Sequence, residues 1–213
     1  MQQIKDLYNS TPVRHLESLG ILDRETVCVH CNWLDDEERD ILADRGARVV
    51  TCPASNMKLA SGIAPVPEML ADNITIGLGT DGCASNNRLD LFREMDLLAK
   101  MHKVHQQDPT TVPARQALKI ATRGGAKILS QQDRIGSLSK GSCADLILLD
   151  LRQPHLLPFY NQDLLVYGAS GADVHTVIIN GRLIMDKKKI LSFDEEETMR
   201  RVSGLVAELQ NSR

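Results

Sequence analysis

An aspartate that directly follows an apolar segment is the first residue of this sequence suited to chemistry. Asp81 comes after Ile74-Thr-Ile-Gly-Leu-Gly79, in the polar loop Thr80-Asp81-Gly82. In parallel α/β folds the functional site lies at the C-terminal ends of the strands. A carboxylate there can bind a divalent cation and also take a proton from the water bound to that cation. The alternative is a turn aspartate that only caps the following helix.

A histidine ends a second strand-like segment. His30 closes the β-branched run Thr26-Val-Cys-Val-His30. Side chains alternate along a strand, so His30 should share a face with Cys28. A histidine at a strand end suits general acid–base catalysis because its pKa lies near neutrality. A lone histidine is more commonly a buried, hydrogen-bonded core residue, and this second interpretation stays open beside the first.

Two further motifs carry weaker signals. Gly77-x-Gly79-x-x-Gly82 matches a dinucleotide fingerprint. That site needs a helix beginning at the loop and an acidic strand end ~20 residues later, whereas a polar loop and a helix follow here. Cys28-x-x-Cys31 could begin a zinc site, but no second ligand pair has suitable spacing, so both cysteines are interpreted as packing residues.

Two remaining segments leave alternatives open. His102 and His105 lie three residues apart on a predicted helix, so they share a face. Their neighbours are lysines and glutamines, which favours a solvated face over a metal site. The segment 51–58, Thr-Cys-Pro-Ala-Ser-Asn-Met-Lys, either lines a pocket or is only a turn broken by proline.

The elements that position these residues follow an alternating pattern. Strands are predicted at 26–30, 48–52 and 74–79, and helices at 35–42, 65–71, 89–104 and 117–130. Strand–helix repeats indicate parallel strands. From about residue 131 the pattern becomes antiparallel, with strands at 144–150, 174–179 and 182–185. Asn180-Gly181 between two strands is a strong hairpin signal, and 194–210 reads as a closing helix. We expect an α/β domain over 1–130 and a β domain over 131–213.

Composition narrows the class of protein. The 213 residues are 42% hydrophobic and 25% charged, with a net charge of −3 and five cysteines. These values are typical of a globular chain, and they lack the basic excess of a nucleic-acid-binding protein. The apolar runs are too short for a membrane span, and the first residues lack a secretory apolar region. An odd cysteine count favours a cytoplasmic protein without disulfides.

Three strand-end motifs together resemble a known family. They are Val29-His-Cys-Asn-Trp-Leu34, Cys52-Pro-Ala-Ser-Asn-Met-Lys-Leu-Ala60 and Gly79-Thr-Asp-Gly-Cys-Ala-Ser-Asn-Asn87. They look like the amidohydrolase superfamily, and most like its 5'-methylthioadenosine/S-adenosylhomocysteine deaminase branch. Triazine hydrolases and guanine deaminases are related alternatives. The resemblance continues through 136–138, 141–150, 154–158 and 177–182, which is nearly the whole chain.

The resemblance implies a fold and a set of roles. The fold would be α/β, namely the last part of a metal-dependent hydrolase (β/α)8 (TIM) barrel plus a C-terminal β-sandwich portion. Asp81 would bind the divalent metal, with zinc expected, activate the hydrolytic water and contact the substrate. His30 would orient or deprotonate that water. The substrate would be a small adenine-type nucleoside, and neither nucleic acid nor membrane is an expected partner.

The same resemblance implies residues that this chain lacks. The family's other metal ligands are three histidines, two of them in an H-x-H motif, and a glutamate protonates the purine. The sequence contains no H-x-H. This predicts an internal start, a split gene or a truncated chain that binds metal poorly and is inactive alone. Open strand edges would promote a homo-oligomer or recruit a complementing chain. The alternative to such a half-enzyme is a non-catalytic remnant or complementing subunit.

Overall fold

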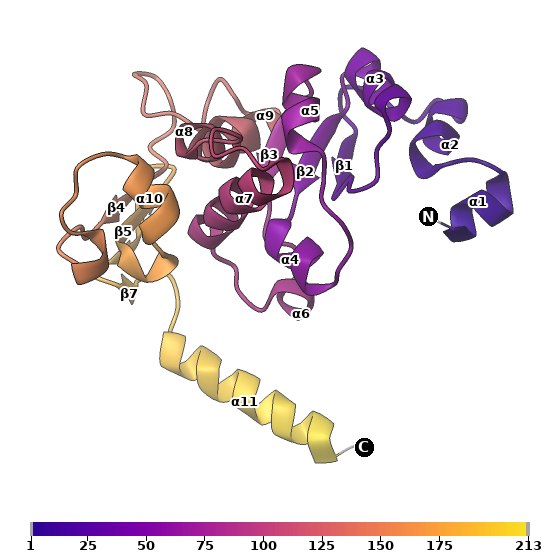
Figure 1. Ribbon diagram of the computed structural model, residues 1–213. Coiled ribbons are helices and arrows are strands. Elements are labelled where there is room, and N and C mark those ends of the chain that lie inside the picture. Colours follow the sequence, from indigo (N-terminus) through magenta and orange to yellow (C-terminus); the bar gives the residue numbers. More distant parts are fainter. Residues whose placement is uncertain (1, 212–213) are drawn as a thin grey trace.

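A three-stranded parallel sheet forms the centre of the first part of the chain. The computed structural model describes residues 2–211. Strands β1 (Val27–Val29), β2 (Arg48–Thr51) and β3 (Ile76–Leu78) pair in the order β1-β2-β3, with Cys28 opposite Val49 and Val50 opposite Gly77. All three run in the same direction (Figure 1). The predicted alternation of parallel strands with helices is therefore confirmed.

The connecting helices begin and end at residues suited to those positions. Helix α3 (Asp36–Arg45) starts with a capping box, in which the Asp35 side chain accepts from the Glu38 backbone and Glu38 accepts from that of Asp35. It ends at Gly46, whose φ of 67° favours glycine. After β2, Pro53 opens α4 (Pro53–Lys58), and α5 (Val66–Ala71) leads into β3. Each crossover returns the chain to the same end of the sheet.

Two helical segments after β3 cover the sheet. The short α6 (Cys83–Asn86) is followed by α7 (Leu91–Gln106), which buries Met95, Leu98 and Ala99. A second helical run comprises α8 (Ala114–Lys119), the π-helical turn η1 (Ile120–Gly124) and α9 (Gly125–Ile128). One helix over 117–130 was predicted. The observed run starts and ends earlier, and contains a π turn where it presses against β3.

Glycine at position 124 is required by this close approach. A Cβ atom at Gly124 would lie 2.2 Å from the backbone oxygen of Ile76 in β3, whereas a Cβ at Gly125 would meet nothing within 4 Å. We expect Gly124→Ala to lower the free energy of unfolding by about 1–3 kcal/mol, because neither backbone segment can yield cheaply. The measurement is urea denaturation. Gly125→Ala is the matched control and should be neutral or stabilising by up to about 1 kcal/mol; equal losses in both variants would contradict the packing argument.

The hydrophobic core lies between the parallel sheet and these helices. Its fully buried members include Leu42 of α3, Val49 of β2, Met69 of α5 and Leu98 of α7. Each such side chain contributes roughly 1.5–3 kcal/mol on burial. One side of the sheet is therefore firmly attached to its helices, and the strand ends that carry the site have a rigid support.

A separate antiparallel sheet follows. It contains β4 (Leu146–Leu149), β5 (Val174–Ile179), β6 (Arg182–Asp186) and β7 (Lys189–Ile190), in that order. The predicted hairpin turn at Asn180-Gly181 is present, with φ of 49° and 75°. The helical turns η2 (Pro154–Leu156) and η3 (Gly171–Asp173) and helix α10 (Asp163–Gly168) lie between β4 and β5. A sandwich and a domain boundary at residue 130 stay predictions.

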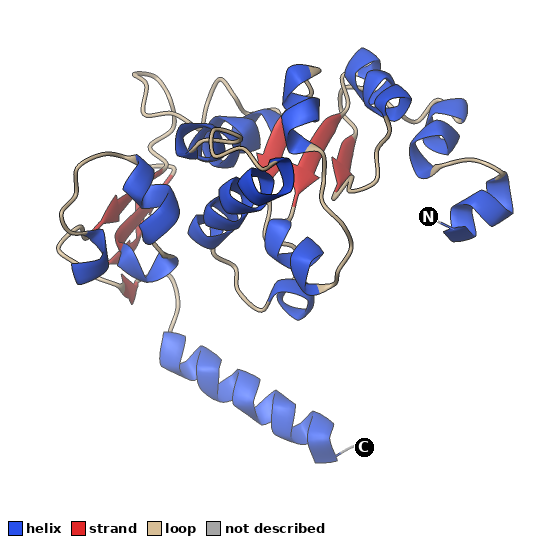
Figure 2. Cartoon of the chain, in the orientation of Figure 1, coloured by secondary structure: helices blue, strands red, loops and turns tan. Residues whose placement is uncertain are grey.

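The two ends of the chain are helical and lie apart from the sheets. Helices α1 (Gln2–Tyr8) and α2 (Pro12–Ser18) precede β1, and α11 (Glu195–Asn211) extends away from the rest of the molecule (Figures 1 and 2). The predicted last helix is present and its residues 195–210 are all exposed, so its closing role stays a prediction. Among the described helices, none is long and apolar enough to cross a membrane.

Candidate functional site

His30 lies at the point where the chain leaves β1. Its backbone N–H still donates to the Val50 carbonyl of β2 at 2.8 Å, so the residue is held at the sheet edge. The backbone then turns sharply, with φ of 72° at His30 and 52° at Cys31. Positive φ values at non-glycine residues cost energy and are concentrated at functional sites. The turn holds the imidazole at the C-terminal end of the strands.

Asp81 lies beyond the end of β3, also with a positive φ of 60°. Its Oδ2 accepts a hydrogen bond from the Ser55 hydroxyl at 2.6 Å, and its Oδ1 accepts from the Gly82 backbone N–H at 2.7 Å. The Ser55 bond is the largest cause that lowers the pKa of Asp81 to about 2, followed by the Gly82 bond. Asp81 is therefore an ionised acceptor at any physiological pH.

The structure brings His30 and Asp81 together. His30 Nε2 lies 3.9 Å from Asp81 Oδ2, and the side chains are 40% and 32% exposed. This distance is too long for a direct hydrogen bond. On the other side of the ring, Nδ1 lies 2.9 Å from Asn56 Oδ1. Asn56 uses its amide nitrogen to donate to Asn32 at 2.9 Å, so its oxygen faces the histidine and Nδ1 must be the donor.

This tautomer determines what the pair can do. With the proton on Nδ1, the lone pair of His30 Nε2 faces the Asp81 carboxylate. Two acceptors that face a gap open to solvent can together orient a water molecule and take a proton from it. Ser55 and Asn56 fix the two acceptors from neighbouring positions in α4, and both are 1% exposed. The segment 51–58 therefore contacts both His30 and Asp81, and its interpretation as the lining of a pocket stays a prediction.

A buried glutamate links helix α4 to the loop that carries Asp81. Glu94 of α7 is fully buried, and its Oε2 accepts from the Ala54 backbone at 2.9 Å. Its Oε1 accepts from Asn86 Nδ2 at 2.8 Å, and the same nitrogen donates to the Thr80 carbonyl at 2.6 Å. Burial raises the pKa of Glu94. Sequence reasoning missed Glu94, although its position four residues before Leu98, on the apolar stripe of α7, was a usable signal.

The cysteine pair beside the site is partly buried. A thiol–thiol hydrogen bond lowers the pKa of Cys28 to about 7 and raises that of Cys31. Both residues are of intermediate exposure, in keeping with packing residues.

The interpretation of His102 and His105 as a shared solvated face is wrong for one of the two. His102 is fully buried, whereas His105 is exposed, because His102 lies four residues after Leu98 on the buried stripe of α7. Neither ring nitrogen of His102 has a hydrogen-bond partner among the described residues. Burial is the main cause that lowers the pKa of His102 to about 4.

This buried histidine should make stability depend on pH. An unfolded histidine has a pKa near 6.5, so the unfolded chain binds more protons than the folded one between pH 6.5 and 4. Stability contributed by neutral His102 is therefore lost as the pH falls through this window, by at most about 3 kcal/mol. Urea denaturation of His102→Leu should show a flatter pH profile. His105→Leu is the control, and an unchanged profile in His102→Leu would contradict the assignment.

The residues of this chain do not by themselves fit a catalytic metal. Within residues 2–211, no group of three or more histidine, cysteine, aspartate or glutamate side chains is placed to hold an ion. A catalytic zinc site uses three protein ligands and a water. His30 and Asp81 supply two donor side chains, and Asp81 is already engaged by Ser55 and Gly82.

Comparison with known proteins now defines the class. The model of the amidohydrolase family matches residues 2–184, and the chain belongs to this family. A curated relative, the 5-methylthioadenosine/S-adenosylhomocysteine deaminase of Syntrophobacter fumaroxidans, is 50% identical over 203 residues. The match covers 95% of this chain but 46% of that protein, so the chain spans about half the length of the curated relatives it matches. The resemblance to this deaminase branch is confirmed.

Solved structures give the same class. An adenosine deaminase from Xanthomonas campestris with bound zinc superposes with a TM-score of 0.95 at 33% identity, over 99% of this chain and 48% of that one. An atrazine chlorohydrolase from Arthrobacter aurescens, complexed with zinc, gives a TM-score of 0.83 at 27% identity, over 95% and 45%. The parallel part of the chain is therefore a fragment of a metal-dependent hydrolase barrel, as predicted.

Proposed function

We propose that this chain is the C-terminal half of a hydrolase that deaminates a small adenine-type nucleoside, such as 5'-methylthioadenosine or S-adenosylhomocysteine. The observation that carries the proposal is the pair of acceptors at the strand ends, with His30 Nε2 3.9 Å from an ionised Asp81. Deamination replaces an amino group by the oxygen of water. A histidine lone pair and a carboxylate that face the same gap suit the removal of protons from that water.

The proposal assigns roles only to residues present in this chain. Asp81 takes a proton from the attacking water and contacts the substrate. His30 Nε2 orients the water, and Asn56 holds the ring through Nδ1. A divalent metal, zinc by analogy with the two solved relatives, belongs to the proposal only for the assembled protein, because this chain supplies too few ligands. A cytoplasmic location is part of the same proposal.

A second polypeptide is part of the proposal because the barrel fragment has uncovered apolar surface. Val27 and Val29 of the edge strand β1 are 40% and 52% exposed, and Trp33 beyond it is 64% exposed. Among the described residues, β1 pairs with a neighbour on one side only. Open, apolar strand edges recruit other chains. A chain that supplies the remaining strands, or a second copy of this one, would cover this surface.

The second candidate function is that of a non-catalytic remnant or complementing subunit. It is favoured by the lack, within residues 2–211, of a group of side chains able to hold a metal. The two candidates differ in one measurable respect, namely activity after the missing half is supplied.

Complementation tests the proposal. The chain would be co-expressed with the N-terminal half of the 50% identical relative, and ammonia release from 5'-methylthioadenosine would be measured. We expect activity with both halves and none with either half alone. The relative cut at the corresponding position and reassembled is the positive control. If that control is active while this chain gives an inactive assembly, the remnant is the better account. Ammonia release by this chain alone would contradict the need for a second polypeptide.

A further inference from the structure

One segment of the chain has a charge opposite to that of the whole. Residues 109–132 contain Arg115, Lys119, Arg123 and Lys127 and neither aspartate nor glutamate, although the full sequence has 28 acidic residues and a net charge of −3. The four cations repeat every fourth residue. On a helix, residues four apart are neighbours on one face, so this spacing produces a stripe of positive charge.

The structure places this stripe on the second helical run. Arg115 and Lys119 lie in α8, Arg123 in the π turn η1 and Lys127 in α9. Like charges at this spacing destabilise a helix by about 0.2–0.5 kcal/mol per pair. The stripe therefore opposes helix formation locally.

No internal counter-ion relieves this repulsion. Across residues 2–211, no carboxylate oxygen lies within 4.0 Å of the charged nitrogens of the four cations, and their side chains donate no hydrogen bond. By contrast, Arg14 lies within 4.0 Å of three carboxylates and Arg39 of two. The donors of the stripe are thus available to an external anion.

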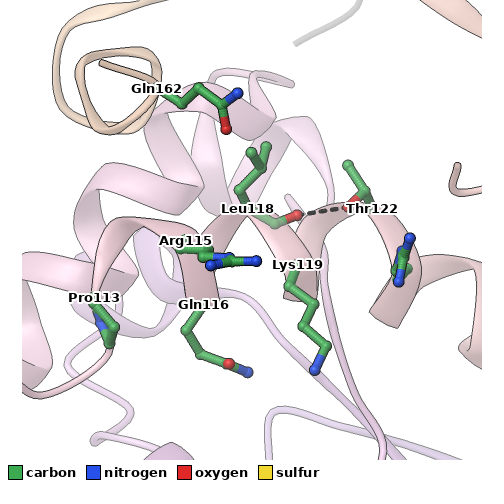
Figure 3. A pocket seen from close by; sticks show the side chains of 8 residues that line it. Pro113, Arg115, Gln116, Leu118, Lys119, Thr122 and Gln162 are labelled. Atoms are coloured by element: carbon green, nitrogen blue, oxygen red, sulfur yellow. Dashed lines mark hydrogen bonds between the residues drawn. The ribbon is translucent and has the colours of Figure 1, made fainter. Parts of the chain in front are cut away.

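The stripe borders a hollow rather than a flat surface. Arg115, Lys119 and Arg123 line a cavity of about 530 Å³, together with Gln116, Thr122 and Gln162 (Figure 3). Gln162 comes from the segment before α10, so two parts of the chain border the space. The side-chain amides of Gln116 and Gln162 add neutral donors to the three cationic groups. The Thr122 hydroxyl is engaged with the Leu118 carbonyl at 2.7 Å.

This hollow is separate from the His30–Asp81 site. A neighbouring depression is lined by Lys119, Arg123 and Lys127 together with residues 73–76, which lead into β3. Asp81 instead follows the C-terminal end of β3. The cations therefore extend toward the N-terminal ends of the strands, and the two sites lie at opposite ends of the sheet.

We propose that this hollow binds a small molecule that carries a linear phosphate chain, such as a di- or triphosphate. Arginine offers a fork of donors that matches phosphate oxygens, and lysine adds a mobile point charge. Cations repeated at ~6 Å along a helix suit an anion whose charge is extended, because each head group can bind a different phosphate. The lining contains no aromatic side chain on which a nucleic-acid base could stack, and the rest of the chain is acidic, so a nucleic acid fits less well.

Calorimetric titration of the purified chain with inorganic triphosphate, at constant ionic strength, tests the proposal. We expect saturable binding of one triphosphate per chain. The double variant Arg115→Gln/Lys119→Gln should weaken it at least tenfold. Lys187→Gln/Lys189→Gln is the matched control, because it removes the same charge from a run of three exposed lysines at the β6–β7 turn and the start of β7. Circular dichroism verifies that both variants fold.

Each outcome decides a part of the proposal. Inorganic phosphate should bind at least tenfold more weakly than triphosphate, since it cannot span the cations. No saturable binding of triphosphate would overturn the proposal. Equal weakening in the two double variants would overturn it as well, because binding would then follow net charge and not this hollow. Equal affinity for inorganic phosphate would overturn the requirement for a phosphate chain.

Discussion

Asp81→Asn should lower kcat/KM for 5'-methylthioadenosine by about 10³-fold in the complemented assembly. Asparagine keeps the size of the side chain, and its oxygen can still accept a hydrogen bond from Ser55 or Gly82. It carries no charge and takes no proton from water, and a general base contributes roughly 10²–10⁴-fold to a rate. The measurement is ammonia release at subsaturating substrate, with the folded state of the variant verified by circular dichroism.

A matched control separates this effect from a general change in charge. Asp133→Asn removes an exposed carboxylate that forms no ion pair with any described residue, and it should leave the rate unchanged. An active Asp81→Asn assembly would show that the role assigned to Asp81 from its strand-end motif is wrong.

His30→Ala should cause a comparable loss of activity, since Nε2 is the only other acceptor that the proposal places at the water.

Glu94→Ala should lower both stability and activity, although Glu94 contacts neither His30 nor Asp81. Its carboxylate is fully buried and accepts from the Ala54 backbone and from Asn86. Alanine leaves these two donors without that acceptor and creates a cavity, so we expect the free energy of unfolding to fall by about 2–4 kcal/mol. Urea denaturation of the isolated chain measures this loss. In the complemented assembly, activity should fall about 10²-fold, because small displacements of catalytic groups are costly.

The conservative variant tests whether Glu94 acts by accepting two hydrogen bonds. In Glu94→Gln, one amide oxygen can still accept from the Ala54 backbone, but its NH₂ group then faces the Asn86 nitrogen. Asn86 Oδ1 is buried without a partner, so rotation of the Asn86 amide would satisfy the new donor. The rotation would break the bond from Asn86 to the Thr80 carbonyl. We expect an intermediate loss.

A surface variant completes the comparison for Glu94. Glu37 is an exposed partner of Arg14, and Glu37→Ala should cost at most about 1 kcal/mol. If Glu94→Ala lowered the free energy of unfolding no more than Glu37→Ala does, Glu94 would not hold α4 and the Asp81 loop in place.

Strand order and the location of the site were predictable because both follow from local patterns. Three β-branched segments separated by helices require parallel strands, and residues that directly follow such strands gather at one edge of the sheet. This reasoning singled out His30 and Asp81, and the structure places His30 Nε2 3.9 Å from Asp81 Oδ2. Asn180-Gly181 was equally readable, because few residue types accept positive φ at two adjacent positions.

The residues around His30 and Asp81 were harder to predict, because their positions depend on packing between distant segments of the chain. Ser55 and Asn56 lie in a segment whose sequence also fits a simple turn, and only the fold places them beside Asp81 and His30. Glu94 and His102 are ionisable, and such residues are usually exposed on helices. Their burial follows from the position of α7 over the sheet. Whether α11 is covered or exposed depends on its neighbours in space, and helical periodicity in the sequence does not reveal those neighbours.

The order β1-β2-β3 has a consequence for how the protein is made. β1 and β2 each pair with the strand that follows in the sequence, and helices connect the paired strands. Contacts between segments close in sequence form quickly, since little loop entropy is lost. The sheet can therefore assemble in the order of synthesis, one strand–helix unit after another as the ribosome releases them. A chain built in this way can complete its own core before it contacts any partner.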